Sequence, residues 1–140
     1  MILLLHGPNL NFLAYRPAKY KGQITYQELI SHLTEYGKKF AIELICKQSN
    51  SEGKLIDILQ EFYLAQDGKG IIINAGAYTH TSIALHDALE IFTIPIIEVH
   101  LSDPSQREKF RHLSYLTAIS QKVIKGKGIK GYEEAIEELA

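Results

Sequence analysis

The length, composition and charge of this chain exclude several classes of protein. Its 140 residues are enough for one domain with a sizeable core, and a hydrophobic fraction of 46% is ordinary for a globular protein. The formal net charge of −1, with mixed signs, gives no electrostatic basis for binding nucleic acid or an anionic membrane surface. No apolar run approaches the ~20 residues of a membrane-spanning helix. A single cysteine, Cys46, cannot form an internal disulfide, so we expect a cytoplasmic protein.

Apolar runs of strand length alternate with segments of helical spacing along the chain. The apolar start lacks the basic region of a signal peptide, so we interpret it as a first buried strand. Two capping boxes, at residues 25–28 and 49–52, open helices that end near Gly37 and Asp67. The predicted strands are 2–5, 42–46, 70–74, 95–100 and 122–124, and the later helices are 81–91, 105–112 and 132–139.

Strands separated by helices of this length pair in parallel through right-handed crossovers. Five such strands favour an α/β fold, a flavodoxin-like three-layer sandwich with a five-stranded parallel sheet of order 2-1-3-4-5. We expect residues 1–140 to form a single catalytic domain. The segment 11–22 is long for a connection between a strand and a helix, and it is therefore predicted to be a lid loop.

Three polar blocks stand where predicted strands give way to loops. They are residues 5–11, 74–82 and 97–102, and they carry Asn, His, Glu and Ser side chains. Ligands bind at the carboxyl ends of the strands in open α/β sheets. The three blocks therefore predict one assembled site for a small polar molecule.

Other motifs point to competing functions. Residues 126–131 match G-x-G-x-x-G, but a dinucleotide site also needs an acidic residue after a further strand, so we interpret this motif as a turn into the last helix. Glu98 and His100 share one face of a predicted strand, and a metal site that includes His6 stays open as an alternative. A receiver domain would need an aspartate where Asn74 stands, and an FMN carrier would need a phosphate loop after the first strand.

Four blocks together resemble type II 3-dehydroquinate dehydratases. In the family's order and nearly its spacing, the chain carries Gly7-Pro8-Asn9-Leu10-Asn11, Asn74-Ala75-Gly76 with Thr79-His80-Thr81-Ser82, Ile97-Glu98-Val99-His100-Leu101-Ser102 and Arg107-Glu108 with Phe110-Arg111 and Ser114-Tyr115. The resemblance runs almost the whole length. It implies loss of water from 3-dehydroquinate to give 3-dehydroshikimate in the shikimate or quinate pathway. It also implies an anti elimination through an enolate, without metal or cofactor.

The resemblance implies five catalytic residues. Tyr20 matches the base in the lid, with the cationic Arg16 beside it, and Asn9 matches the residue that helps to hold a water on the enolate. His100 matches the general acid, with Glu98 beside it. These residue types suit the chemistry, because a proton next to a ketone needs a base and a β-hydroxyl needs an acid to leave as water. A phenol has a pKa of about 10, so it acts as a base at neutral pH only if a cation stabilises its anion.

The resemblance also implies how the substrate is bound. Asn74, the amides of Leu101 and Ser102, and the Ser102 hydroxyl match the groups that bind the substrate carboxylate. His80 and Arg111 match groups that bind hydroxyls. Two backbone amides at the start of a helical turn are a suitable seat for an anion.

A homo-oligomer is implied as well, commonly a dodecamer of four trimers. Asp87 matches a residue that reaches the site of a neighbouring subunit, and an ion pair within the chain is the alternative. Arg107, on the same predicted helix as Arg111, has no assigned role beyond a contact between subunits.

The chain departs from the family pattern in the lid. The usual residue between the arginine and the proline is missing, so Arg16 stands four residues before Tyr20. Lys19 or Lys21 could share the role of the arginine, and Tyr15 is the rival of Tyr20 as base. A catalytically weakened flavodoxin-like homologue that binds a polyol carboxylate is the alternative function. A Schiff-base lyase is disfavoured because no lysine follows a predicted strand in the motif loops.

Overall fold

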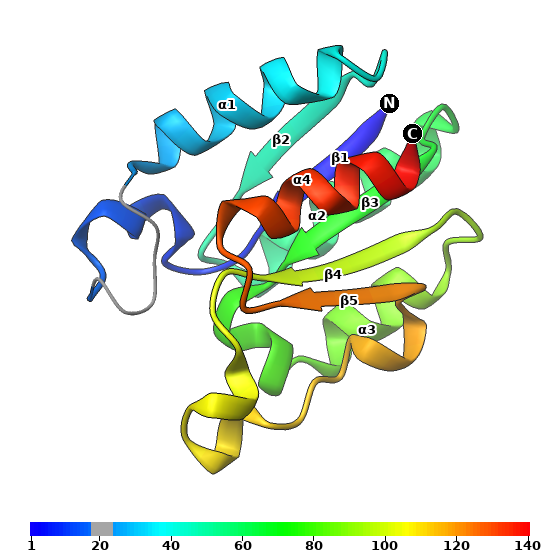
Figure 1. The fold of residues 1–140 in the computed structure, drawn as a ribbon. Helices are drawn as coiled ribbons and strands as arrows, with labels where there is room; N and C mark the ends of the chain where they lie inside the picture. The colour runs from blue at the N-terminus through cyan, green and yellow to red at the C-terminus, as the bar shows by residue number, and fades with distance from the viewer. Residues whose placement is uncertain (18–23) are drawn as a thin grey trace.

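A five-stranded parallel sheet lies at the centre of the molecule (Figure 1). The computed structural model describes residues 1–17 and 24–140. The strands are β1 (Ile2–His6), β2 (Leu44–Gln48), β3 (Gly70–Asn74), β4 (Ile96–His100) and β5 (Lys122–Lys125). They pair in parallel in the order β2-β1-β3-β4-β5. The fold class and strand order predicted from the sequence are confirmed.

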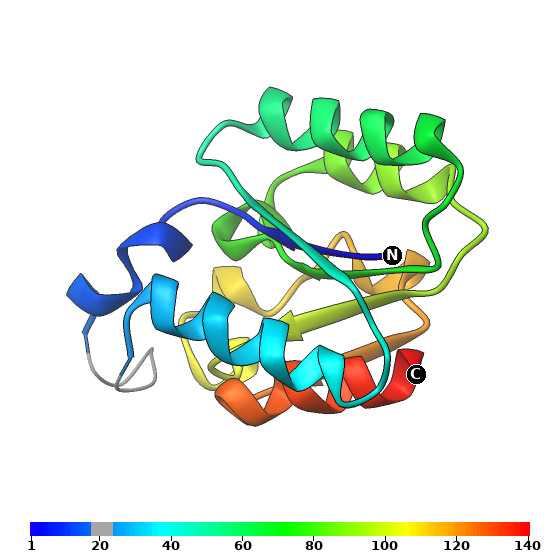
Figure 2. The same cartoon turned by 90° about the horizontal axis from the view of Figure 1, so that it is seen from above.

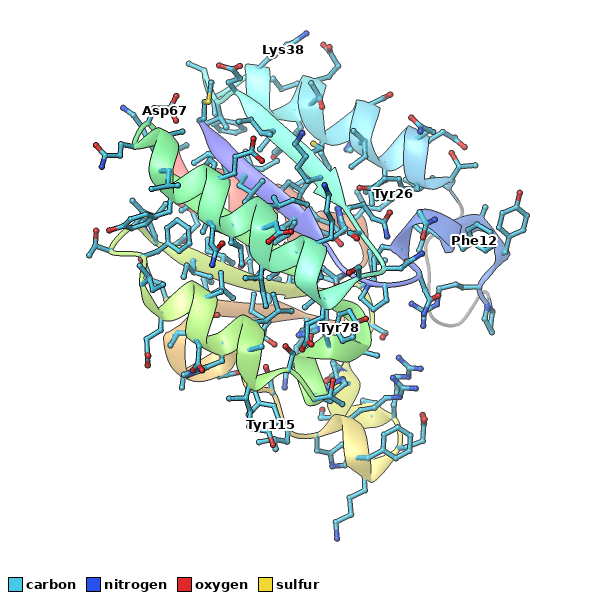
Figure 3. The ribbon with its side chains drawn as sticks, turned by 180° about the vertical axis from the view of Figure 1, so that it is seen from behind. Phe12, Tyr26, Lys38, Asp67, Tyr78 and Tyr115 are labelled. Atoms are coloured by element: carbon cyan, nitrogen blue, oxygen red, sulfur yellow. The ribbon has the colours of Figure 1, made fainter. Side chains whose placement is uncertain are left out.

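Two helices cover each face of the sheet. Helices α1 (Tyr26–Lys38) and α4 (Ile129–Leu139) lie together on one face, and α2 (Glu52–Ala65) and α3 (Ile83–Glu90) lie on the other (Figure 2). The α2 and α3 layer is seen directly from behind (Figure 3). Within the described residues, no helix has the length and apolar character required to cross a membrane.

The strand side chains alternate between the two layers. Ile2 and Leu4 of β1 belong to the core under α1 and α4, whereas Leu3 and Leu5 belong to the core under α2 and α3. Every residue of β1, β3 and β4 is buried, because both faces are covered. The same alternation sends polar side chains at the strand ends to opposite faces, which decides what each of them can contact.

Local side-chain hydrogen bonds begin the first two helices. The Thr25 hydroxyl accepts from the Glu28 amide at 3.1 Å while the Glu28 carboxylate accepts from the Thr25 amide at 3.2 Å, so the first predicted capping box is confirmed. The second prediction was wrong by two residues. Ser51, not Ser49, caps α2, and its hydroxyl accepts from the Lys54 amide at 3.2 Å.

The starts of three other elements differ from the prediction by two or three residues. β2 begins two residues later than expected, because the Ile42 amide donates to the Gly37 carbonyl at 2.9 Å and so belongs to the turn that ends α1. Helix α3 begins at Ile83, because a 3₁₀ helix (η3, Gly76–His80) precedes it and Ser82 caps it. Helix α4 begins three residues earlier than expected.

The helix predicted at residues 105–112 was wrong. Two separate 3₁₀ turns stand there, η4 (Pro104–Gln106) and η5 (Lys109–Arg111). Arg107 has extended backbone angles (φ −114°, ψ −163°) and Glu108 a ψ of 147°, so the helical hydrogen bonds are interrupted between the turns. Arg107 and Arg111 therefore do not stand one turn apart on a helix.

Candidate active site

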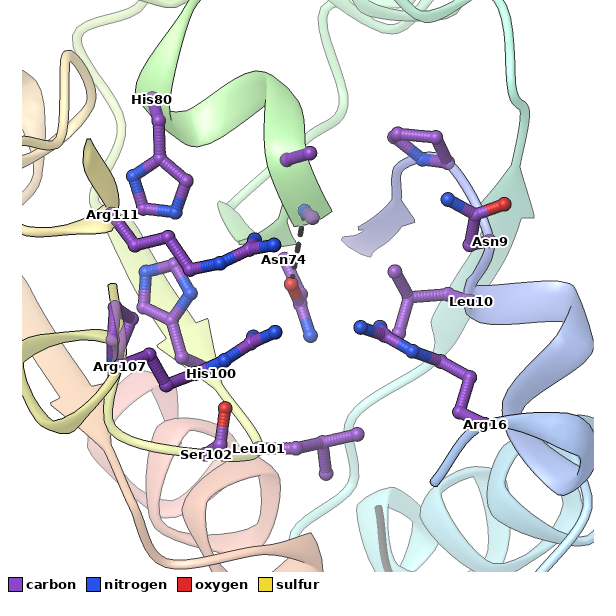
Figure 4. A pocket seen from close by; sticks show the side chains of 14 residues that line it. Asn9, Leu10, Arg16, Asn74, His80, His100, Leu101, Ser102, Arg107 and Arg111 are labelled. Carbon is purple, nitrogen blue, oxygen red and sulfur yellow. Dashed lines mark hydrogen bonds between the residues drawn. The ribbon is translucent and has the colours of Figure 1, made fainter. Parts of the chain in front are cut away.

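A polar pocket of about 130 Å³ opens at the carboxyl edge of the sheet, beside the ends of β1, β3 and β4 (Figure 4). The pocket draws on all three polar blocks and on the segment after β4. Its lining consists of Pro8, Asn9, Leu10, Arg16, Asn74, Gly76, Ala77, His80, His100, Leu101, Ser102, Pro104, Arg107 and Arg111.

The structure brings most of the predicted site residues together at this pocket. Those that line it are Asn9, Arg16, Asn74, His80, His100, Leu101, Ser102 and Arg111. Arg107, which had no predicted role in the site, lines it too. Glu98 lies behind His100, whereas Asp87 is an exposed residue of α3 and is not part of the lining. Tyr20, together with Lys19 and Lys21, lies outside the described residues, so the predicted base has no described position.

His100 is held from behind by a buried carboxylate. Its Nε2 lies 2.5 Å from an oxygen of Glu98, and the same carboxylate accepts hydrogen bonds from Ser114 at 2.7 Å and Thr117 at 2.8 Å. Burial opposes ionisation of Glu98, but the hydrogen bonds and the charge of His100 outweigh it and keep the pKa of that carboxyl below its usual value. Because Nε2 of His100 faces Glu98, Nδ1 is the ring nitrogen available to a ligand.

Three arginines make the pocket strongly cationic. Arg16 enters from the segment after β1, and Arg107 and Arg111 enter from the opposite side (Figure 4). Nε of Arg111 donates to Glu108 at 3.0 Å, which orients the guanidinium. His80 donates from Nδ1 to the Leu113 carbonyl at 2.7 Å and so has Nε2 as its remaining acceptor. Such a lining favours an anionic ligand that also carries hydroxyl groups.

The loop that carries Asn9 is held by residues that sequence reasoning missed. Asn9 has a left-handed backbone (φ 72°), which asparagine tolerates better than most residues, and its amide donates to the Asn50 side chain at 3.0 Å. Gln48 donates to the Gly7 carbonyl at 3.1 Å. A side chain at Gly7 would meet the Ala75 carbonyl oxygen at 2.2 Å, so only glycine fits there. The available signal was the polar end of β2, at the same edge of the sheet.

The glycine-rich motif supports the site rather than a dinucleotide. The Gly126 amide donates to the Ser102 carbonyl at 3.2 Å, and the Gly128 amide donates to the Leu101 carbonyl at 3.1 Å. Both glycines have positive φ angles, 75° and 59°, and the turn leads directly into α4. The prediction of a glycine-rich turn into the last helix is therefore confirmed, and the turn also holds the strand end that carries Leu101 and Ser102.

The alternative metal site does not assemble. By strand alternation, the side chain of His6 lies on the α1 and α4 face, whereas Glu98 and His100 lie on the other face. The sheet therefore separates the three groups. Within the described residues, the one set of three clustered metal-ligating side chains is His86, Asp87 and Glu90, on the outer surface of α3.

Comparisons with known proteins agree with this geometry. The family model "Dehydroquinase class II" matches residues 1–140. A 3-dehydroquinate dehydratase of Histophilus somni is 49% identical over 137 residues, which is 97% of this chain and 89% of that protein. The type II dehydroquinase structure from Butyrivibrio crossotus has a TM-score of 0.95 at 46% identity, covering 99% of this chain and 95% of that one. The type II dehydroquinase structure from Propionibacterium acnes has a TM-score of 0.93 at 36% identity, covering 99% of this chain and 94% of that one. This chain belongs to the class II dehydroquinase family.

Proposed function

We propose that this protein is a 3-dehydroquinate dehydratase, a cytoplasmic hydro-lyase of the shikimate or quinate pathway that uses no cofactor. The observation that carries the proposal is the pairing of His100 with the buried Glu98 at a pocket lined by three arginines. The reaction needs a proton donor for the leaving hydroxyl and a cationic seat for a carboxylate, and this pocket offers both.

The substrate carboxylate is proposed to bind beside the ends of β3 and β4. Asn74 lines the pocket there, together with Leu101 and Ser102, whose amides and hydroxyl can donate to carboxylate oxygens. His80 and Arg111, on the side of the segment after β4, are proposed to bind the hydroxyl groups of the ring. The carboxylate and the hydroxyls together fix which face of the ring meets His100.

His100 is proposed to protonate the leaving hydroxyl. The ionised Glu98 accepts a hydrogen bond from Nε2 of His100 and holds the ring so that Nδ1 faces the pocket. The carbon–oxygen bond breaks as the hydroxyl takes the His100 proton and leaves as water. The electron pair of the enolate forms the new carbon–carbon double bond, which is conjugated with the ketone.

Proton abstraction is assigned to Tyr20 in the lid. A phenolate is a competent base near neutrality if a cation stabilises it, and Arg16, which only Pro17 separates from the undescribed segment, lines the pocket. Asn9 lines the opposite wall from His100 and is proposed to hold a water on the enolate oxygen. In an anti elimination the base and the acid act on opposite faces of the ring, which a lid and a strand end can supply.

Turnover of 3-dehydroquinate tests the proposal directly. The product is a conjugated enone, so its absorbance should rise when purified protein is mixed with substrate. Substrate deuterated stereospecifically at the carbon next to the ketone distinguishes anti from syn loss. Binding of 3-dehydroquinate without any turnover would instead identify a weakened homologue that binds a polyol carboxylate. Irreversible inactivation by borohydride in the presence of substrate would contradict the mechanism, because it would reveal a Schiff base on a lysine.

A further inference from the structure

A chain of hydrogen bonds on the α1 and α4 face of the sheet ends at Asn74. His6 is fully buried at the end of β1 between the hydroxyls of two tyrosines. Its Nε2 lies 2.9 Å from the Tyr132 hydroxyl, and its Nδ1 lies 3.2 Å from the Tyr26 hydroxyl. The Tyr132 hydroxyl also lies 2.8 Å from Nδ2 of Asn74. The chain therefore joins α1, β1 and α4 to a residue of β3 that lines the pocket.

Burial keeps every group in this chain uncharged near neutral pH. Loss of hydration lowers the pKa of His6 to about 3, so the ring is neutral. The same effect raises the pKa of Tyr132 and of Tyr26, so both phenols keep their protons. A neutral imidazole has one donor and one acceptor nitrogen, and each buried phenol has a single proton to donate.

The backbone at Gly76 sets the direction of the chain. The Gly76 amide can only donate, and it donates to Oδ1 of Asn74 at 3.1 Å (Figure 4). Nδ2 of Asn74 is thereby turned to Tyr132, whose oxygen accepts. The Tyr132 proton is then donated to Nε2 of His6, so the proton of His6 is on Nδ1 and is donated to Tyr26. With the proton of His6 on Nε2 instead, both His6 and Asn74 would donate to the Tyr132 oxygen. The Tyr132 hydroxyl proton would then have no acceptor at a fully buried site.

We propose that Tyr132 and His6 are positioning residues that act through Asn74, so that its amide always presents an N–H group to the pocket. The amide nitrogen has two protons, of which Tyr132 accepts one, and the planar amide directs the other away from Tyr132. This inference rests on the proposed function, in which Asn74 binds the substrate carboxylate. It adds that Asn74 meets the carboxylate only as a donor, and that a residue 58 positions away on α4 holds the amide in the orientation that the Gly76 amide selects.

Tyr132→Phe tests the inference in steady-state kinetics, because it deletes one hydroxyl and leaves the ring. Without the acceptor only the Gly76 amide holds the Asn74 side chain, so its N–H group is less firmly positioned, and we expect KM for 3-dehydroquinate to rise by about tenfold, the order of one hydrogen bond to a charged group. We expect kcat to change by less than about twofold, since His100 is untouched. Tyr26→Phe is the matched control, because it removes a phenol oxygen from the other nitrogen of the same ring, and it should leave KM within about twofold.

A double-mutant cycle separates positioning from a general loss of structure. In an Asn74→Ala background, Tyr132→Phe should change KM no further, because its effect passes through Asn74. An equal rise in KM in both backgrounds, an unchanged KM, or an equal effect of Tyr26→Phe would overturn the inference. Unfolding by denaturant shows which variants are folded.

The tautomer of His6 provides a measurement that does not depend on activity. Nitrogen-15 NMR of the ligand-free protein should report Nδ1–H and an unprotonated Nε2, with no change between about pH 5 and pH 8, since both lie above the lowered pKa. A proton on Nε2 would overturn the inference even if 3-dehydroquinate is turned over normally. If the protein shows the expected tautomer of His6 but does not turn over 3-dehydroquinate, the proposed function is contradicted. The orientation of the hydrogen-bond chain is still supported in that case.

Discussion

Glu98 and His100 stand two residues apart on the same face of β4, and their side chains meet through a hydrogen bond of 2.5 Å. Ser114 and Thr117, from the segment that also carries Arg111, donate to the same carboxylate. Glu98 therefore connects the strand that bears the proposed acid to the segment that bears a proposed substrate-binding arginine. One buried anion thus joins the two chain segments that form the side of the pocket opposite Arg16.

His100→Ala should remove protonation of the leaving hydroxyl. We expect kcat to fall by roughly 10²–10⁴-fold, the usual size of one general-acid contribution. KM should change less, because the proposed carboxylate seat is formed by Asn74, Leu101 and Ser102. Single-turnover kinetics separate binding from chemistry, and Asn74→Ala gives the contrasting pattern in which KM rises most. Near-normal turnover by folded His100→Ala would mean that another residue is the acid.

Thr117→Val should destabilise the protein through Glu98. The change keeps the shape of the side chain but deletes a donor to a carboxylate that is 1% exposed. Loss of a partner by a buried charged group costs roughly 1–3 kcal/mol, so the free energy of unfolding in urea should fall by about that amount. Thr117→Ser keeps the hydroxyl, so its free energy of unfolding should fall by less than that of Thr117→Val. Equal stability of the Val and wild-type proteins would show that the hydrogen bond contributes nothing measurable.

His6 should make the native state sensitive to acid. Its pKa is lowered to about 3 by burial, whereas the unfolded chain binds a proton near the ordinary value of 6.5. Between these values the unfolded state holds more protons, so this contribution to stability is complete above about pH 6.5 and is lost as the pH falls toward 3. The slope from this one group is at most about 1.4 kcal/mol per pH unit.

The measurement is the free energy of unfolding at a series of pH values, for wild type and for His6→Gln. The variant should be less stable at pH 7, yet its stability should fall less steeply between pH 6.5 and the lowest pH at which it folds. Parallel slopes would contradict the assignment of a neutral, buried imidazole.

The lid should depend on Tyr20 and not on Tyr15. Tyr15 is 80% exposed and does not line the pocket. Its ring packs against Phe12, which points outward at the edge of the molecule (Figure 3). We therefore expect Tyr20→Phe to abolish turnover while leaving ligand binding measurable, and Tyr15→Phe to matter little. Arg16→Ala should reduce turnover and move the alkaline side of the pH profile upward. If Tyr15 proves essential and Tyr20 dispensable, the alignment of this loop is wrong.

Asp87 should act between subunits. Its side chain is 70% exposed on α3, and its nearest ionic partner is the adjacent His86 at 3.2 Å. If it serves the site of a neighbour, the protein should assemble in a multiple of three subunits, and we expect a dodecamer of four trimers. Light scattering measures the mass, and Asp87→Ala should reduce activity more than stability of the subunit fold. A fully active monomer would contradict this prediction.

The elements of the fold follow from local sequence, whereas their boundaries depend on neighbours. Apolar runs predict the strands because central strands are buried on both faces, and the capping box at Thr25 is complete within four residues. The segment 105–112 has helical spacing, yet it forms two 3₁₀ turns joined by extended backbone at Arg107. Its Arg107 and Arg111 side chains line the pocket and Arg111 donates to Glu108, and such contacts override a weak helical preference.

The sequence by itself determined which polar blocks stand at the carboxyl edge, because the parallel direction of the strands follows from the βα alternation. Only the tertiary structure decided which side chains meet there. His6 and Tyr132 are 126 residues apart, and Glu98 and Thr117 come from a strand and from a short 3₁₀ helix (η6, Thr117–Ile119). Nothing in local periodicity encodes such pairs, since they form only when the packed layers bring donors and acceptors within about 3 Å of one another.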